Sequence, residues 1–213
     1  MTTRQRQTGR GRSYRETMRH EIINDINLTL RTLLEEELKG VFKNVTVKLA
    51  DLEDFKKGET KTGINVFPYG VTINEPGYRT KEEVRHLEQG ENGEPVYVFY
   101  PRPVPITISF MITPFATDPQ TEYRLLGRII QVFQENPVVT GARLKGAWLP
   151  KQDKISFSPD YGFSVDRQME IFRAYDIPFK MSVGYLARAY LDSDKVIRQS
   201  RVARGIRHDE GSG

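Results

Sequence analysis

The chain has 213 residues and a mass of 24.6 kDa, which fits one sizeable domain with appendages. It contains no cysteine, so disulfides, thiolate nucleophiles and thiolate metal sites are excluded, and folding in the cytosol is the natural expectation. No apolar run approaches the roughly 18 residues that a membrane span needs, and no apolar segment follows the Arg-rich N-terminus, so we expect neither a membrane span nor a signal peptide.

The formal net charge of +4 is unevenly distributed along the chain. Residues 1–19 hold six arginines and one glutamate, and residues 195–207 hold five basic residues and no acidic one, so each end carries +5. Asp209 and Glu210 subtract two, which leaves residues 20–194 at −4. A protein that binds nucleic acid with its folded body usually carries basic charge on that body. We therefore expect basic ends that meet an acidic partner, a description that includes other copies of the same chain.

The N-terminal part of the sequence predicts an extension followed by a helix. Residues 1–12 have almost no apolar side chain to bury, so we expect them to be disordered in isolation. Ser13 and Glu16 have the spacing of a capping box, and apolar residues at helical spacing continue from there to Leu38. Gly40 lies where a left-handed C-terminal cap would end this helix.

Two strand patterns and a polar excursion follow. Residues 45–49 and 63–73 have the composition and spacing of strands. Pro68 cannot donate a backbone hydrogen bond, so it predicts an edge position, a bulge or a break in the second of these strands. Residues 74–95 are polar and contain an Asn-Gly turn signal, which predicts a long excursion or a hairpin.

The best-specified segment is a strand followed by a helix. Within residues 106–115, one face carries Ile106, Ile108, Phe110 and Ile112, and the other carries Thr107, Ser109, Met111 and Thr113. Asp118 and Pro119 start the helix, and Asn136 with the following proline ends it. The wide apolar stripe of this helix, which predicts that it is part of the core, consists of Leu125, Leu126, Ile129, Ile130 and Phe133.

Three shorter patterns complete the sequence of elements. Residues 155–158 predict a brief strand, and residues 179–187 alternate as a last strand. Between them, Ser164 can cap a short helix that carries Met169, Ile171 and Phe172.

The order of these elements indicates the α+β class, in a single domain whose mostly antiparallel or mixed sheet is flanked by helices. We divide the chain into a basic N-terminal extension of residues 1–12, this domain over residues 13–191, and a basic C-terminal tail of residues 192–213.

The sequence offers no convincing reaction centre. His20, His86 and His208 fall in a helix start, a polar excursion and a tail, and no spacing places two of them on one face. Residues 56–63 resemble a phosphate-binding loop only faintly, because Thr60 stands where the glycine before the lysine is required. No Gly-x-Ser-x-Gly elbow is present. We therefore expect a protein that is not an enzyme and has no catalytic residue, metal site or cofactor.

Other polar and aromatic residues have structural explanations. Asp118 and Glu122 lie at a helix start, where free N–H groups and the helix dipole favour carboxylates. Trp148, the single tryptophan, lies among small and apolar residues, which favours a buried or interface anchor.

The basic ends carry the remaining functional signal. The segment "TGRGRSYR" interleaves arginine, glycine and tyrosine as single-stranded nucleic-acid-binding segments do, although a flexible basic tail without a defined target is more common. The basic residues within 195–207 recur every three residues, which on a helix gives either a line suited to an acidic groove or a solvated face. The candidate partner-binding residues are Arg4, Arg6, Arg10, Arg12, Lys195, Arg198, Arg201, Arg204 and Arg207.

Four blocks of the sequence together resemble a known family. They are "LTLRTLLEEEL" (28–38), "INVFPYGVTIN" (64–74), "PITISFMITPFATDPQTEYRLLGRIIQVFQENPVV" (105–139) and "DIPFKMSVGYLARAYL" (176–191). The third is the most specific, because an apolar strand ending in Thr-Pro-Phe-Ala leads through Asp-Pro-x-Thr-Glu and Leu-Leu-Gly-Arg to a helix that closes on Glu-Asn-Pro-Val. With these blocks the chain resembles the tail-terminator, or cap, proteins of bacterial phage-tail-like contractile injection systems.

The resemblance implies an α+β domain similar to the terminators of long-tailed phages. It also implies that six copies form a ring on the last layer of the inner tube and sheath, which ends polymerisation and anchors the sheath to the tube. The implied partners are a homo-hexamer, the sheath protein and the inner tube protein, in a particle assembled in the cytoplasm that acts there or after release. The alternative is a nucleic-acid-binding module acting through the basic tails, which the acidic body makes the weaker interpretation.

Overall fold

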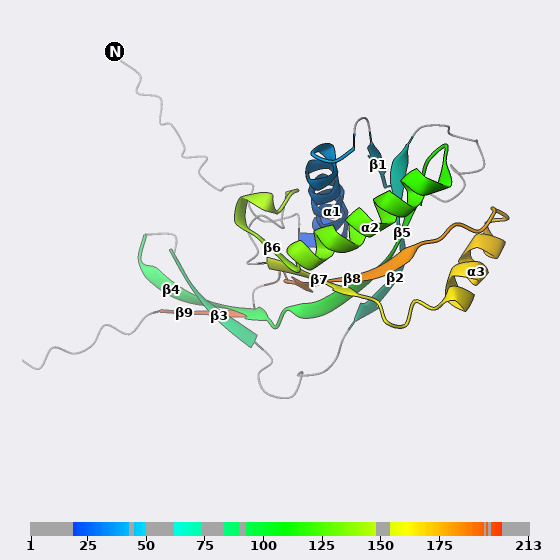
Figure 1. The fold of residues 1–213 in the computed structure, drawn as a ribbon. Helices are drawn as coiled ribbons and strands as arrows, with labels where there is room; N and C mark the ends of the chain where they lie inside the picture. The colour runs from blue at the N-terminus through cyan, green and yellow to red at the C-terminus, as the bar shows by residue number, and fades with distance from the viewer. Residues whose placement is uncertain are drawn as a thin grey trace, which may run out of the picture.

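The computed structural model describes residues 19–42, 45–49, 62–73, 83–89, 93–147, 154–193, 195 and 197–201. Within these ranges the chain forms a six-stranded sheet, a three-stranded sheet and three α-helices (Figure 1). The predicted α+β class, with a mixed sheet flanked by helices, is confirmed. The capping box at Ser13 and the anchor at Trp148 lie outside the described residues, and the division into extensions and domain stays a prediction.

The six-stranded sheet has the order β1-β2-β5-β8-β7-β6, and its neighbours are antiparallel except for the parallel pair β1 and β2. Its strands are β1 (Thr46–Lys48), β2 (Gly63–Ile73), β5 (Val104–Phe115), β6 (Val138–Thr140), β7 (Lys154–Pro159) and β8 (Val183–Leu191). The smaller sheet consists of β3 (Glu83–Gln89), β4 (Pro95–Pro101) and β9 (Arg198–Arg201). The helices are α1 (Ile22–Lys39), α2 (Pro119–Glu135) and α3 (Val165–Ala174), with 3-10 turns at Arg19–Glu21 and Gly141–Arg143.

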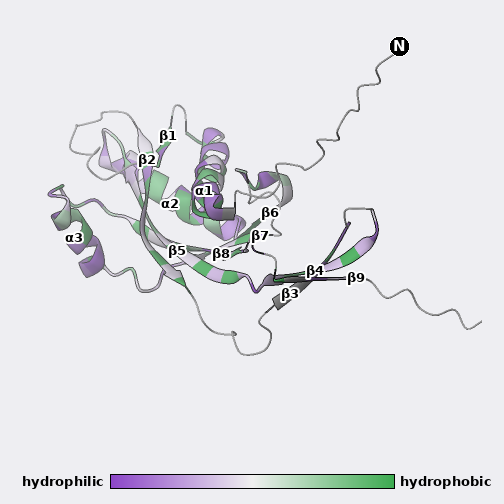
Figure 2. Cartoon of the chain, turned by 180° about the vertical axis from the view of Figure 1, so that it is seen from behind, coloured by the Kyte–Doolittle hydropathy of each residue, from purple (hydrophilic) through white to green (hydrophobic). Residues whose placement is uncertain are grey.

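The main core lies between the six-stranded sheet and helices α1 and α2, which pack on the same face of it (Figure 1). The predicted apolar face of β5 is buried here, and hydrophobic and hydrophilic residues alternate along this strand (Figure 2). Helix α1 contributes Ile26, Leu30 and Leu34, none of which is exposed. We call the six-stranded sheet with its three helices the body.

Helix α2 begins as the sequence predicts. Asp118 accepts a hydrogen bond from the backbone N–H of Thr121 at 2.8 Å, and Pro119 occupies the first turn. The predicted stripe is partly wrong, because Ile130 is 47% exposed and Val132 is buried instead. Val132 lies beside Ile129 and Phe133 on the side of the helix that faces the sheet.

The opposite face of the sheet is covered at one end by α3. Met111 of β5, predicted on the semi-polar face, is fully buried there against Ile171, Phe172 and Ile177. Gly184 of β8 allows this close packing, because a Cβ on it would lie 2.5 Å from the side chain of Phe163. The second face of β5 is therefore more deeply buried than its polar residues predict.

Pro68 has the effect predicted from the sequence. The register of β2 against β5 shifts between Pro68 and Gly70, which is a β-bulge. On its other side β2 pairs with β1 only at residues 63–65, so Pro68 also lies on an edge.

Two expectations are corrected by the structure. Gly40 ends α1 in a right-handed conformation (φ −73°), because the N–H of Phe42 already bonds to the carbonyl of Leu38. Strand β8 begins at Val183, not at Phe179, which is 49% exposed and packs edge-on against Phe172.

No helix among the described residues is long and apolar enough to cross a membrane.

Candidate functional site

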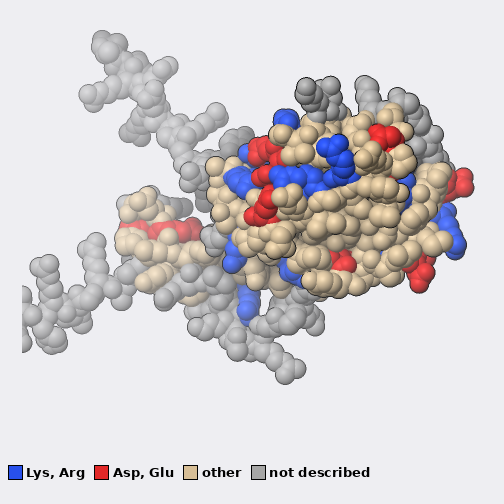
Figure 3. Space-filling view, in the orientation of Figure 1, with Lys and Arg blue, Asp and Glu red and all other residues tan. Residues whose placement is uncertain are grey.

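Within the part of the chain that the structure describes, the largest group of paired charges joins α1, α2 and the 3-10 turn that follows β6. Arg128 donates to the Glu37 side chain at 3.2 Å and to Glu135 at 3.0 Å, and Arg143 donates to Glu37 at 3.0 Å. Arg143 also donates to Asn136 at 2.7 Å. Figure 3 shows acidic and basic side chains interleaved over this part of the surface. The group fastens two helices and a loop together. The packing of the body therefore explains these ion pairs, and they need no catalytic role.

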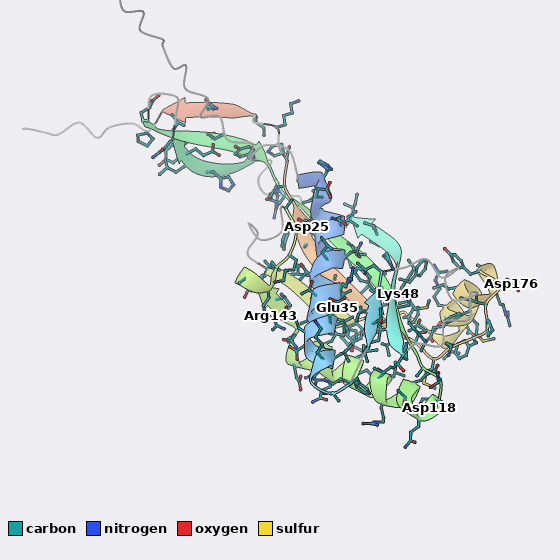
Figure 4. The ribbon with its side chains drawn as sticks, turned by 90° about the horizontal axis from the view of Figure 1, so that it is seen from above. Asp25, Glu35, Lys48, Asp118, Arg143 and Asp176 are labelled. Atoms are coloured by element: carbon teal, nitrogen blue, oxygen red, sulfur yellow. The ribbon has the colours of Figure 1, made fainter. Side chains whose placement is uncertain are left out.

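A buried carboxylate fastens the next loop to α1. Asp25 is 1% exposed and accepts from the backbone N–H of Ala147 at 3.2 Å, and Thr29 accepts from the N–H of Lys145 at 2.9 Å. Gly146 between them has φ +105°, and a Cβ there would lie 1.9 Å from Oδ1 of Asp25. Figure 4 shows Asp25 in the first part of α1, near the three-stranded sheet.

The carboxylates at the start of α2 serve as caps and anchors. The hydrogen bond from the backbone N–H of Thr121 lowers the pKa of Asp118 below its usual value. Glu122 accepts from the backbone N–H of Ala116 at 3.1 Å and pairs with Lys180. The structural explanation predicted for Asp118 and Glu122 therefore holds, and Glu122 additionally fastens the segment before β8.

A polar hollow lies between β2, β5 and α3. The Tyr69 hydroxyl donates to Oδ2 of Asp160 at 2.5 Å, and Asp160 also accepts from the backbone N–H of Gly162 at 2.9 Å. Burial, followed by the bond to Asp160, raises the pKa of Tyr69 above its usual value, so the phenol keeps its proton. The hollow is lined by Tyr69, Ser109, Asp160, Gly162, Ser164, Asp166, Arg167 and Glu170. Asp160 and Glu170 have hydrogen-bond partners, and among the described residues no group of three or more metal-ligating side chains is found.

The three-stranded sheet lies at the end of the molecule opposite α3, where it projects away from the body (Figures 1 and 4). We call β3, β4 and β9 the projecting sheet. Strand β4 continues into β5 after Arg102 and Pro103, and β9 follows β8 by six residues, so the projecting sheet extends the central strand pair of the body. The N–H of Ile197 donates to the carbonyl of Phe99 at 2.7 Å and brings the C-terminal segment onto β4.

The structure describes only part of the predicted partner-binding set. Lys195 is exposed, and Arg198 and Arg201 are the first and last residues of β9. The helical line of charges is wrong over residues 198–201, because these residues form a strand that pairs with β4. The remaining residues, which lie outside the described ranges, are Arg4, Arg6, Arg10, Arg12, Arg204 and Arg207.

Strand β9 is an element that sequence reasoning misses. Its sequence, Arg-Gln-Ser-Arg, has no apolar residue, so only its pairing with β4 defines it. The available signal was in its partner, where residues 96–100 are five consecutive valine and aromatic residues that favour a strand. The predicted hairpin in the 74–95 excursion does form, but its second strand continues to Pro101.

Comparisons with known proteins address the family and the fold. The Pvc16 N-terminal domain family matches residues 25–204. The fold is similar to the PVC sheath/tube terminator of an extracellular contractile injection system in the extended state, with 13% identity and a TM-score of 0.58 over 90% of this chain and 64% of that chain. It is also similar to the tube-terminating cap of the anti-feeding prophage, with 16% identity and a TM-score of 0.53 over 87% of this chain and 59% of that chain.

The chain thus spans about three fifths of the length of these two solved proteins. No curated protein matches the sequence. The family match nevertheless covers most of the chain and includes the block 105–139 on which the predicted resemblance depends. The chain belongs to the Pvc16 N-terminal domain family, and the predicted tail-terminator family is confirmed.

Proposed function

We propose that this protein is the terminator, or cap, of a contractile injection system. Six copies form a ring on the last layer of the inner tube and sheath, which ends polymerisation and anchors the sheath to the tube. The observation that carries the proposal is the similarity of 90% of this chain to a solved sheath/tube terminator, together with the family match. In this role the protein has no reaction to catalyse, and it works in a particle that is assembled in the cytoplasm and acts after release.

The internal contacts of the body support this role. A cap must keep its shape while the filament beneath it contracts, so its elements need to be fastened to one another. The Arg128–Glu37 and Arg143–Glu37 pairs, the buried Asp25 and the Glu122–Lys180 pair each join segments that are far apart in the sequence. Their combined effect is a rigid body whose functional surfaces are available for partners.

The basic ends supply the contacts with those partners. Residues 20–194 carry −4 while each end carries +5, so an end of one copy is attracted to the acidic body of a neighbour. Arginine forms bidentate bonds with carboxylates, which gives such contacts direction as well as charge. We assign this role to the nine residues predicted from the sequence, with the sheath and inner tube proteins as further acidic partners.

Deleting the gene in cells that make the particle tests the proposal. Without the cap we expect particles of variable length whose sheaths separate from the tube, and the full chain should restore uniform particles. The double variant Arg204→Glu and Arg207→Glu should restore them poorly, because its charge opposes an acidic partner. The matched control is the double variant Lys154→Glu and Arg173→Glu, which alters two exposed basic residues of the body by the same total charge and should restore them fully. Uniform, intact particles in the deletion strain would contradict the proposal.

A further inference from the structure

The edge strands of the two sheets differ in length and in whether they are interrupted. An open edge presents unpaired N–H and C=O groups that pair readily with another strand, and proteins usually shorten or interrupt such edges. In the body, the edge strands β1 and β6 have three residues each, and the remaining edge of β2 is interrupted by Pro68 and its bulge. In the projecting sheet, β3 runs for seven residues without proline or glycine. Among the described residues, β3 and β9 each pair with β4 only.

We infer that β9 of one copy pairs with β3 of the next copy, so that the projecting sheets join edge to edge around the ring. The inference rests on the proposed ring and names the surfaces that close it. The two edges belong to different strands, which makes the contact heterologous, as a closed ring requires. Both strands run antiparallel to β4 and therefore parallel to each other. The rotation of 60° that relates neighbours in a ring of six turns a strand by at most 60°, so the new pair is parallel in sense.

The charges of β3 and β9 indicate that a second copy of the chain is the partner that pairs with these edges. Strand β9 contributes two arginines and no acid, a charge of +2, and β3 contributes Glu83 and Glu88 against Arg85, a net charge of −1. The Glu88 side chain is exposed and accepts a hydrogen bond at 2.8 Å from the hydroxyl of Tyr100 on β4. Figure 3 shows acidic side chains on the projecting sheet. A strand of net charge −1 therefore meets a strand of charge +2 in the next copy.

Engineered cysteines can detect this contact, because the chain has none of its own. Leu87, which is 64% exposed, Tyr97 and Ser200 lie in one row across β3, β4 and β9, on one face of the sheet. Two strand spacings, about 10 Å, separate Leu87 from Ser200 within a copy, which is too far for a disulfide. A disulfide between Leu87→Cys and Ser200→Cys therefore joins different copies. Gln89→Cys, two residues along the same face, covers the alternative register.

The experiment oxidises the full-length double variants and resolves them on a non-reducing gel. We expect a ladder from one of the pairs Leu87→Cys/Ser200→Cys and Gln89→Cys/Ser200→Cys, in multiples of the chain mass up to six. Each single variant should stay monomeric, and so should the control pair Tyr161→Cys/Ser200→Cys, since Tyr161 is 94% exposed at the α3 end. A hexamer by light scattering without a ladder overturns the edge pairing and leaves the proposed function intact. Dimers from Leu87→Cys alone overturn its heterologous geometry, and a chain that is monomeric at every concentration overturns both proposals.

Discussion

The body and the projecting sheet are built on different principles although β4 and β9 of the projecting sheet are adjacent in the chain to β5 and β8, the central strands of the body. In the body, one face of the sheet is covered by α1 and α2, one end of the other face is covered by α3, and the edges are short or interrupted. In the projecting sheet, no helix covers the described strands (Figure 1), and within the described ranges β3 and β9 pair with β4 only. The comparison indicates that the body supplies its own stability, whereas on our inference the projecting sheet is completed by a neighbouring copy.

The largest difference in stability between the body and the projecting sheet should appear when one large side chain is removed from each. Phe110 of β5 is fully buried, so Phe110→Ala should lower the free energy of unfolding by about 3–5 kcal/mol through lost burial and a cavity. Leu87→Ala, on the exposed side of β3, should change it by less than about 0.5 kcal/mol. Urea denaturation of both variants measures the difference. Equal losses would show that the projecting sheet is as tightly packed as the body.

Two glycines with positive φ allow a matched test of the loops. Gly93→Ala in the hairpin of the projecting sheet has open space, so it should cost only the conformational penalty of about 1–2 kcal/mol. Gly146→Ala should cost about 1–3 kcal/mol more, because its Cβ overlaps the buried Asp25 carboxylate. Thermal unfolding of the two variants measures this. If both lose the same stability, the loop at residues 144–147 is not fastened to α1 as described.

The prediction from sequence succeeded where packing and local signals agree. The strand before Asp118 and the helix after it carry period-two and period-3.6 apolar patterns, a proline at the helix start and an asparagine at its end, and all of these appear in the structure. The bulge at Pro68 follows from the chemistry of proline in the same way. These features depend on residues close together in the sequence.

Features that depend on distant partners could not be predicted. Ile130 satisfies the helical pattern as well as Val132 does, and only the direction in which the sheet lies decides which of them is buried. Strand β9 has no apolar residue and takes its structure from β4. For the same reason the three-residue spacing of the basic residues within 195–207 suggests a helix, although residues 198–201 form a strand. This spacing is compatible with either structure.

The charged group on the body offers a smaller effect. Arg128 has only 15% of its side chain exposed and joins α1 to α2, so Arg128→Met should lower the free energy of unfolding by about 1–2 kcal/mol. Arg31→Met, which removes an exposed pair within one helix, should cost no more than about 0.5 kcal/mol. Chemical denaturation of both variants provides the measurement. An equal, small loss would mean that the pairs on the body are solvated surface charges and do not fasten its helices.

The smallest effect should come from the charge on the cap of α2. The pKa of Asp118 is lowered in the folded state, so its charge stabilises the fold above the ordinary value of 3.8, and this contribution is lost as the pH falls through the lowered value. Asn caps a helix as well as Asp does but carries no charge. Asp118→Asn should therefore lower the urea midpoint slightly at neutral pH, and the difference should shrink as the pH falls below 3.8. A difference that persists in acid would contradict this assignment.

The position of the protein on the assembled particle tests the account most directly. A reconstruction of particles that carry a tagged copy of the chain would show where the tag lies and in what number. We predict one ring of six copies at the end distal to the baseplate, in contact with both sheath and tube and with the projecting sheets of neighbouring copies touching. Copies spread along the sheath, or an end without them, would contradict the central claim that this chain caps the filament.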